Sequence, residues 1–73
     1  MKFKVDDIVE VVSADAFYYK VMGRIDSILV DPELDYFEYN VVFEMIDMET
    51  DEVTIYEECV YLEEEIELVK RGN

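Results

Sequence analysis

Residues 36–47 read Tyr36-Phe37-Glu38-Tyr39-Asn40-Val41-Val42-Phe43-Glu44-Met45-Ile46-Asp47, and this stretch decides the fold of the chain. Every odd-numbered position from 37 to 45 is aromatic or apolar, whereas Glu38, Asn40 and Glu44 occupy even positions. Side chains of a β-strand alternate between its two faces, so this period of two predicts a long strand over 36–47. We expect the odd positions to face the core and the even positions to be mostly solvated, although Val42 and Ile46 interrupt the polar side.

Shorter apolar runs on both sides of this stretch predict three more strands, at 8–12, 21–30 and 53–56. In the first of them, Val9 and Val11 alternate around a glutamate and are expected to face inward.

Polar segments separate these runs. Residues 31–35 contain Pro32, which cannot donate a hydrogen bond to a strand ladder, so we expect them to join the two long strands as a loop. Residues 47–52 predict a second polar turn. Gly23 lies near the start of the run 21–30, where a glycine indicates a bulge or a close approach of two backbones.

The last segment has two interpretations. Ile66 and Leu68, with Glu67 between them, indicate a short closing strand preceded by a helical turn near 58–62. One continuous helix is the alternative, because glutamate is a good helix former and one helical face would hold Cys59, Leu62, Ile66 and Val69.

Five short strands predict an all-β fold with at most one short helix, formed as one domain over residues 1–73. We expect a five-stranded antiparallel barrel, since closing so small a sheet removes its exposed edges. The order of elements resembles the SH3-like barrels of the Tudor and KOW type, with Asp6 where their first motif has glycine. The segments that carry the resemblance are Val5-Asp6-Asp7-Ile8-Val9-Glu10-Val11, Lys20-Val21-Met22-Gly23-Arg24-Ile25, Tyr39-Asn40-Val41-Val42-Phe43 and Ile66-Glu67-Leu68-Val69. The resemblance implies binding to peptides, nucleic acid or larger enzymes rather than catalysis.

The charge of the chain is separated by sign. Residues 25–69 carry 16 acids and no base, and the rest carries four acids and six bases, so the net charge is −16 + 2 = −14. A field of this sign excludes nucleic acid and anionic membranes as direct partners of that region and favours a basic protein surface, such as one that binds nucleic acid.

The acidic side chains suggest how such a surface would be recognised. Residues i and i+2 of a strand lie about 6.6–6.8 Å apart on one face, about twice the ~3.4 Å axial rise between phosphates of one DNA strand. Outward carboxylates therefore approximate a row of phosphates, and in charge and size the chain is similar to small acidic bacteriophage inhibitors that mimic nucleic acid. The predicted contact residues are Asp31, Glu33, Asp35, Glu38, Glu44, Asp47, Glu49, Asp51 and Glu52, with Glu63, Glu65 and Glu67 near the end of the chain.

Two tyrosines in the loop after the first strand, Tyr18 and Tyr19, are predicted to supply apolar anchors, because tyrosine is enriched at interfaces. They also support an alternative function, an adaptor that reads a peptide or a subunit of a larger complex through an aromatic groove. Halophilic adaptation and simple solubility remain further explanations for the acidity. Three apolar side chains expected on the outer face, Val30, Val42 and Ile46, leave room for a homodimer.

The chain lacks the residues that several classes of function require. The chain has no histidine, and its single cysteine, Cys59, follows two glutamates that oppose thiolate formation, so we expect no enzyme. Residues 47–58 begin like a calcium-binding loop, but Glu52 occupies the position that requires glycine, so we expect no metal and no cofactor. The first residues lack a signal peptide and no run is long enough to span a membrane. We therefore expect a cytoplasmic protein, in the host cytoplasm if a phage encodes it.

Overall fold

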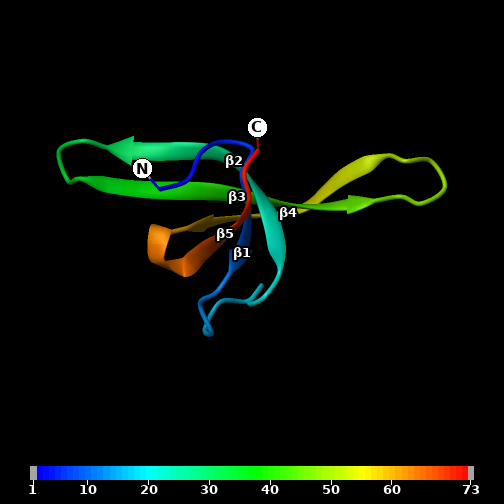
Figure 1. Ribbon diagram of the computed structural model, residues 1–73, viewed down its shortest axis with the longest axis horizontal. Helices are drawn as coiled ribbons and strands as arrows, with labels where there is room; N and C mark the ends of the chain where they lie inside the picture. Colours follow the sequence, from blue (N-terminus) through cyan, green and yellow to red (C-terminus); the bar gives the residue numbers. More distant parts are fainter. Residues whose placement is uncertain (1, 73) are drawn as a thin grey trace.

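A computed structural model describes residues 2–72, and its strands form one antiparallel sheet (Figure 1). The sheet order is β4-β3-β2-β1-β5, which confirms the prediction of an all-β, five-stranded fold. Within the described residues β4 pairs only with β3 and β5 only with β1, so the sheet is open and its closure into a barrel remains a prediction. The elements are β1 (Ile8–Val11), β2 (Met22–Asp31), β3 (Tyr36–Ile46), β4 (Val53–Tyr61), a 3-10 turn η1 (Glu63–Glu65) and β5 (Ile66–Lys70).

Two hairpins extend the sheet in opposite directions (Figure 1). The β2–β3 hairpin ends in the turn at 32–35, and the β3–β4 hairpin ends in the turn at 47–52. Together they give the molecule dimensions of 47 × 27 × 19 Å. Both polar turns were predicted, and they lie at the two ends of the long axis.

The core lies on the odd-numbered face of β3, as predicted. Tyr39, Val41 and Phe43 are fully buried there, and they pack with Phe3, Val9, Val11, Ile25, Tyr61 and Ile66. The prediction fails at the distal end of β3, where Met45 is 59% exposed because the hairpin has left the core behind.

The even-numbered face of β3 is less solvated than predicted. Val42 is fully buried, and it lies beside Ile8 and Arg24 at an open hollow of about 180 Å³ on the outer face of the sheet. Ile46 and Val30 remain exposed. The apolar outer surface that would serve a homodimer therefore lacks the contribution of Val42.

Gly23 lies directly against side chains of the core, so the close contact at this position is with side chains and not with a second backbone. A Cβ atom at this position would lie 2.5 Å from Val41 Cγ1 and 2.9 Å from Phe43 Cε1, both of them in the core. We expect Gly23→Ala to lower the free energy of unfolding by about 1–3 kcal/mol, because overpacking forces neighbouring side chains to shift. Urea denaturation measures this loss. Ser27→Ala, an exposed change in the same strand, is the control and should stay within about 0.5 kcal/mol; equal stability of the two variants would contradict the prediction.

β4 is longer than the predicted strand at 53–56, and the predicted helical turn near 58–62 is wrong in position. Residues 58–61 belong to β4, and the turn follows as η1, where the Glu65 carboxylate accepts the Leu62 N–H at 2.8 Å. A bulge in β4 explains why the predicted strand was too short. The register with β3 changes between the pairs Phe43↔Glu57 and Glu44↔Ile55, which leaves Tyr56 as an extra residue. The extra residue reverses the inside–outside alternation, which hides the strand from a pattern of period two. The closing strand at 66–70 is confirmed over the helical alternative.

Candidate functional site

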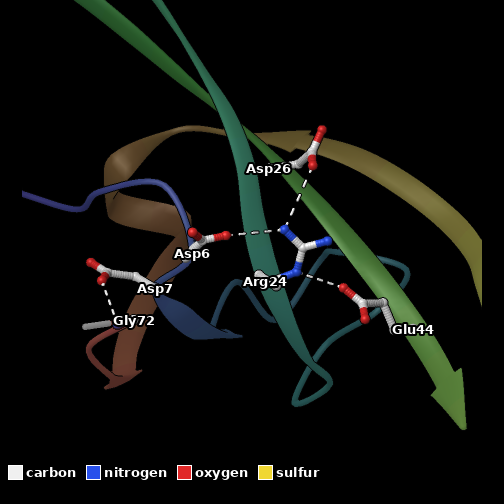
Figure 2. A network of polar contacts seen from close by, with 6 residues as sticks. All are labelled: Asp6, Asp7, Arg24, Asp26, Glu44 and Gly72. Carbon is white, nitrogen blue, oxygen red and sulfur yellow. Dashed lines mark hydrogen bonds and ion pairs between the residues drawn. The ribbon is translucent and has the colours of Figure 1, made fainter. Parts of the chain in front are cut away.

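Asp7 holds the two ends of the chain together (Figure 2). Its carboxylate is nearly fully buried and accepts hydrogen bonds from the backbone N–H groups of Lys4 (2.9 Å) and Gly72 (3.0 Å) and from Arg71 Nη1 (3.1 Å). Burial alone raises the pKa of Asp7, but these hydrogen bonds and the charge of Arg71 outweigh it, so the pKa lies below its ordinary value. Four bases consequently lie around the joined chain ends, outside residues 25–69, which carry acids and no base: Lys2, Lys4, Lys70 and Arg71.

Replacing this carboxylate tests the contact. We expect Asp7→Asn to lower the free energy of unfolding at pH 7 by about 1–3 kcal/mol, because charge-assisted hydrogen bonds become neutral and one amide nitrogen faces donors. A folded-state pKa below that of unfolded aspartate, about 3.9, means that the contribution is complete well above pH 4 and disappears as the pH falls through the folded-state pKa. Urea denaturation should therefore give a difference between wild type and variant that shrinks at pH 3. A constant difference from pH 7 to pH 3 would contradict this assignment.

Arg24 neutralises one of the predicted contact residues (Figure 2). Its guanidinium contacts Glu44 at 2.6 Å, Asp6 at 3.3 Å and Asp26 at 3.6 Å. The hydrogen bond that Arg24 donates to Glu44 is the largest influence on Arg24 and raises its pKa, so this cation stays charged. Glu44 is therefore engaged within the fold, and the carboxylates of Asp6 and Asp26 share the same cation. Asp6 adopts a left-handed conformation (φ 75), the geometry that suits the glycine of the resembling motif.

The structure separates the predicted contact residues of the two turns. Asp31 and Asp47 start these turns by accepting backbone hydrogen bonds from the residues two positions on, Glu33 (3.1 Å) and Glu49 (2.8 Å). The remaining turn acids are exposed, and the two groups lie at opposite ends of the molecule. One group consists of Asp31, Glu33 and Asp35, and the other of Asp47, Glu49, Asp51 and Glu52.

A third acidic group lies at η1, close to the first turn. Asp35, Glu63 and Glu64 line one hollow of about 280 Å³ together with Tyr36, Phe37 and Leu62. A hydrogen bond with Glu38, partial burial and the carboxylate of Glu64 raise the pKa of Tyr36, which places Glu38 beside the same group. Glu65 caps η1, and Glu67 is exposed on β5.

Glu57 and Glu58 on β4 lie between the acidic turn at 47–52 and η1. The sequence predicts a strand only over 53–56, so these two glutamates are not among the predicted contacts. The carboxylates thus form separate groups along β4 and its two ends rather than one closely spaced row. Four of the twenty acids form ion pairs (Asp6, Asp7, Asp26 and Glu44), which leaves sixteen without a cationic partner among residues 2–72.

An aromatic cluster stands beside Glu57. Tyr18 stacks on Phe43 with ring centroids 4.8 Å apart, and its hydroxyl donates to Glu57 Oε2 at 3.1 Å. Burial, followed by this hydrogen bond, raises the pKa of Tyr18. Phe17 packs edge-on against Tyr18 at 5.1 Å and is 92% exposed, whereas Tyr19 is partly exposed beside Lys20. Sequence reasoning missed Phe17, although its place directly before two tyrosines was an available signal.

Comparison with models of known protein families, with curated proteins and with solved structures found no match to this chain. Among the residues that the structure describes, no helix has the length and apolar character needed to cross a membrane. No group of three or more acidic or cysteine side chains in this part of the chain could hold a metal ion.

Proposed function

We propose that this protein is a non-catalytic inhibitor that binds the basic nucleic-acid-binding surface of another protein and competes with the nucleic acid. The observation that carries the proposal is the set of sixteen carboxylates without ion pairs among residues 2–72, of which thirteen lie in the two hairpin turns, in β4, or in η1 and β5. Unpaired surface charge of one sign creates a field that attracts a surface of the opposite sign.

The charge density supports the comparison with nucleic acid. A net charge of −14 over a longest dimension of 47 Å corresponds to about one negative charge per 3.4 Å, the axial spacing of phosphates along one DNA strand. The open, elongated sheet matters here, because a rounder domain would concentrate the same charge over a shorter axis.

The position of the bases determines which side of the protein would face a basic partner. Asp7 holds the chain ends together, so their lysines and Arg71 gather on one part of the molecule, while residues 25–69 carry acids alone. A basic partner would be repelled by the chain ends and attracted to the hairpins and β4. Simple solubility does not require such a separation, since dispersed charge serves it equally well.

A charge variant tests the proposal. In the quadruple variant Asp47→Asn/Glu49→Gln/Asp51→Asn/Glu52→Gln the net charge falls to −10, while an asparagine oxygen at 47 still accepts the turn hydrogen bonds. Basic proteins retained from a lysate on the immobilised wild type are purified, and their binding to labelled duplex DNA is measured by fluorescence anisotropy. We expect wild type to displace the DNA and the variant to need at least tenfold more protein at low salt, because steering falls with charge.

The outcome that would overturn the proposal is a ternary complex, in which protein and DNA bind the purified partner together. Equal competition by wild type and variant would show that this turn is not the contact. The matched control is Ser27→Ala, an exposed and uncharged change that should leave competition unaltered.

The aromatic cluster supports a second candidate function, an adaptor for a peptide. The exposed ring of Phe17 packs on the half-buried ring of Tyr18, whose hydroxyl donates to the Glu57 carboxylate. If this cluster is the principal contact, Tyr18→Ala or Tyr19→Ala abolishes binding to the same purified partner while the quadruple charge variant binds nearly as well as wild type. The reverse pattern favours the inhibitor.

A further inference from the structure

We propose that the free edge of β4 receives an extended, basic segment of the partner as an added strand. This inference rests on the proposed function for the sign of the partner, and it adds the element that is bound and its mode of binding. An edge strand offers a row of unpaired backbone N–H and C=O groups, which extended peptides use to join a sheet.

Among residues 2–72, no strand pairs with the outer edge of β4. Its nine residues, Val53–Tyr61, pair with β3 on one side, and within the described chain no backbone hydrogen bond from a loop or turn reaches them. The other edge of the sheet, β5, has only five residues and ends beside two bases, Lys70 and Arg71. β4 is therefore the longer of the two free edges and the one bordered by acids.

One contact identifies backbone groups that point away from β3. The N–H of Glu58 donates to the side chain of its neighbour, Glu57 Oε1, at 3.1 Å. Because N–H groups alternate between the two sides of a strand, the N–H of Val60 points to the same outer side as that of Glu58. The Glu57 carboxylate thus covers an edge donor that an added strand would engage directly.

The acidic groups are spaced along this edge. Asp51 and Glu52 precede β4, Glu57 and Glu58 lie in its second half, and Glu63 and Glu64 follow it. A strand of nine residues spans about 30 Å at ~3.3 Å per residue. A partner segment with a lysine or arginine at every second or third position would therefore meet each group, while the exposed side chains of β4, such as Val53, Ile55 and Val60, would contact its apolar residues.

The same charges argue against a second copy of the chain as the occupant. Pairing β4 with β4 of another molecule would bring the negatively charged glutamates of both strands together, and each molecule has a net charge of −14. Like charges directly opposite each other destabilise a strand pair, whereas opposite charges stabilise it. Natural edge strands often carry charges that prevent self-association, and here the sign of those charges admits a basic strand.

The probe is a nine-residue peptide of alternating lysine and valine, N-methylated at every valine so that only one of its edges can pair and it cannot assemble into sheets of more than two strands. The comparison peptide has the same sequence and charge and is N-methylated at every residue, so neither edge can donate. Binding to the full chain is followed at 0.15 M NaCl by amide chemical shifts and hydrogen exchange. We expect the first peptide to bind at least tenfold more tightly than the second and to slow exchange at the Glu58 and Val60 amides.

Equal affinity of the two peptides would overturn the proposal, because it would mean attraction by charge alone. Slowed exchange on β5 rather than on β4 would overturn it as well. The matched acidic peptide, with glutamate in place of lysine, should not bind. If the protein displaces DNA from its partner but the peptide leaves β4 unchanged, the added strand is excluded and the inhibitor function stands. If the peptide pairs with β4 but the protein does not displace DNA from its partner, the proposed function is wrong.

Discussion

Phe43→Ala is expected to lower the free energy of unfolding by about 3–5 kcal/mol, the usual cost of removing a buried aromatic ring. Phe43 is fully buried where several elements meet: its ring stacks on Tyr18, lies 6.5 Å from the ring of Tyr61 and packs against the backbone at Gly23. A single small core of this size supplies only several kcal/mol of net stability. The variant should therefore lose most of its folded population and release the loop that carries Tyr18.

Urea denaturation followed by circular dichroism measures this loss. Phe43→Leu keeps most of the apolar volume, stays measurable if the alanine variant is unfolded, and should fall between wild type and alanine. Phe17→Ala is the matched control, because Phe17 is 92% exposed and its removal should change stability by less than about 0.5 kcal/mol. Similar losses for Phe17→Ala and Phe43→Ala would place the core elsewhere.

The alternation in β3 was sufficient to predict the fold class. It identified Tyr39, Val41 and Phe43 as core residues, and the polar segments between runs located both hairpin turns. The same kind of pattern failed to predict the length of β4. The bulge at Tyr56 shifts the register there, and one extra residue moves every later side chain to the opposite face. Closure of the sheet could not be decided either, since local periodicity contains no information about whether two distant edge strands meet.

The candidate site was predictable in its charge and not in its arrangement. The absence of bases from 25–69 can be read directly from the chain, and the interface role that the sequence predicts for Tyr18 stays a prediction. The pairing of Arg24 with Glu44, twenty positions apart, and of Asp7 with Arg71, sixty-four apart, depends on tertiary packing. These contacts decide which acids are already neutralised and where the bases gather, so the acid-only surface can be outlined only from the structure.

The same unpaired charge that defines the proposed site should make the isolated protein unusually sensitive to salt. Raising NaCl from 10 mM to 0.5 M is expected to raise Tm by about 5–15 °C, because each kcal/mol of relieved repulsion shifts Tm by about 4–8 °C in a domain of this size. A net charge of −14 repels itself most in the folded state, where the carboxylates are confined to a body of 47 × 27 × 19 Å.

Differential scanning calorimetry at pH 7 over this range of salt gives Tm directly, and the quadruple variant at 47, 49, 51 and 52 provides the matched control. With a net charge of −10, the variant should have a higher Tm than wild type at 10 mM NaCl and a smaller increase with salt. A general effect of salt on apolar burial would raise both proteins equally, so only the difference between the two slopes reports the repulsion. A wild-type Tm that stays constant or falls with NaCl would mean that the carboxylates are compensated within the fold, which would also remove the basis for attracting a basic partner.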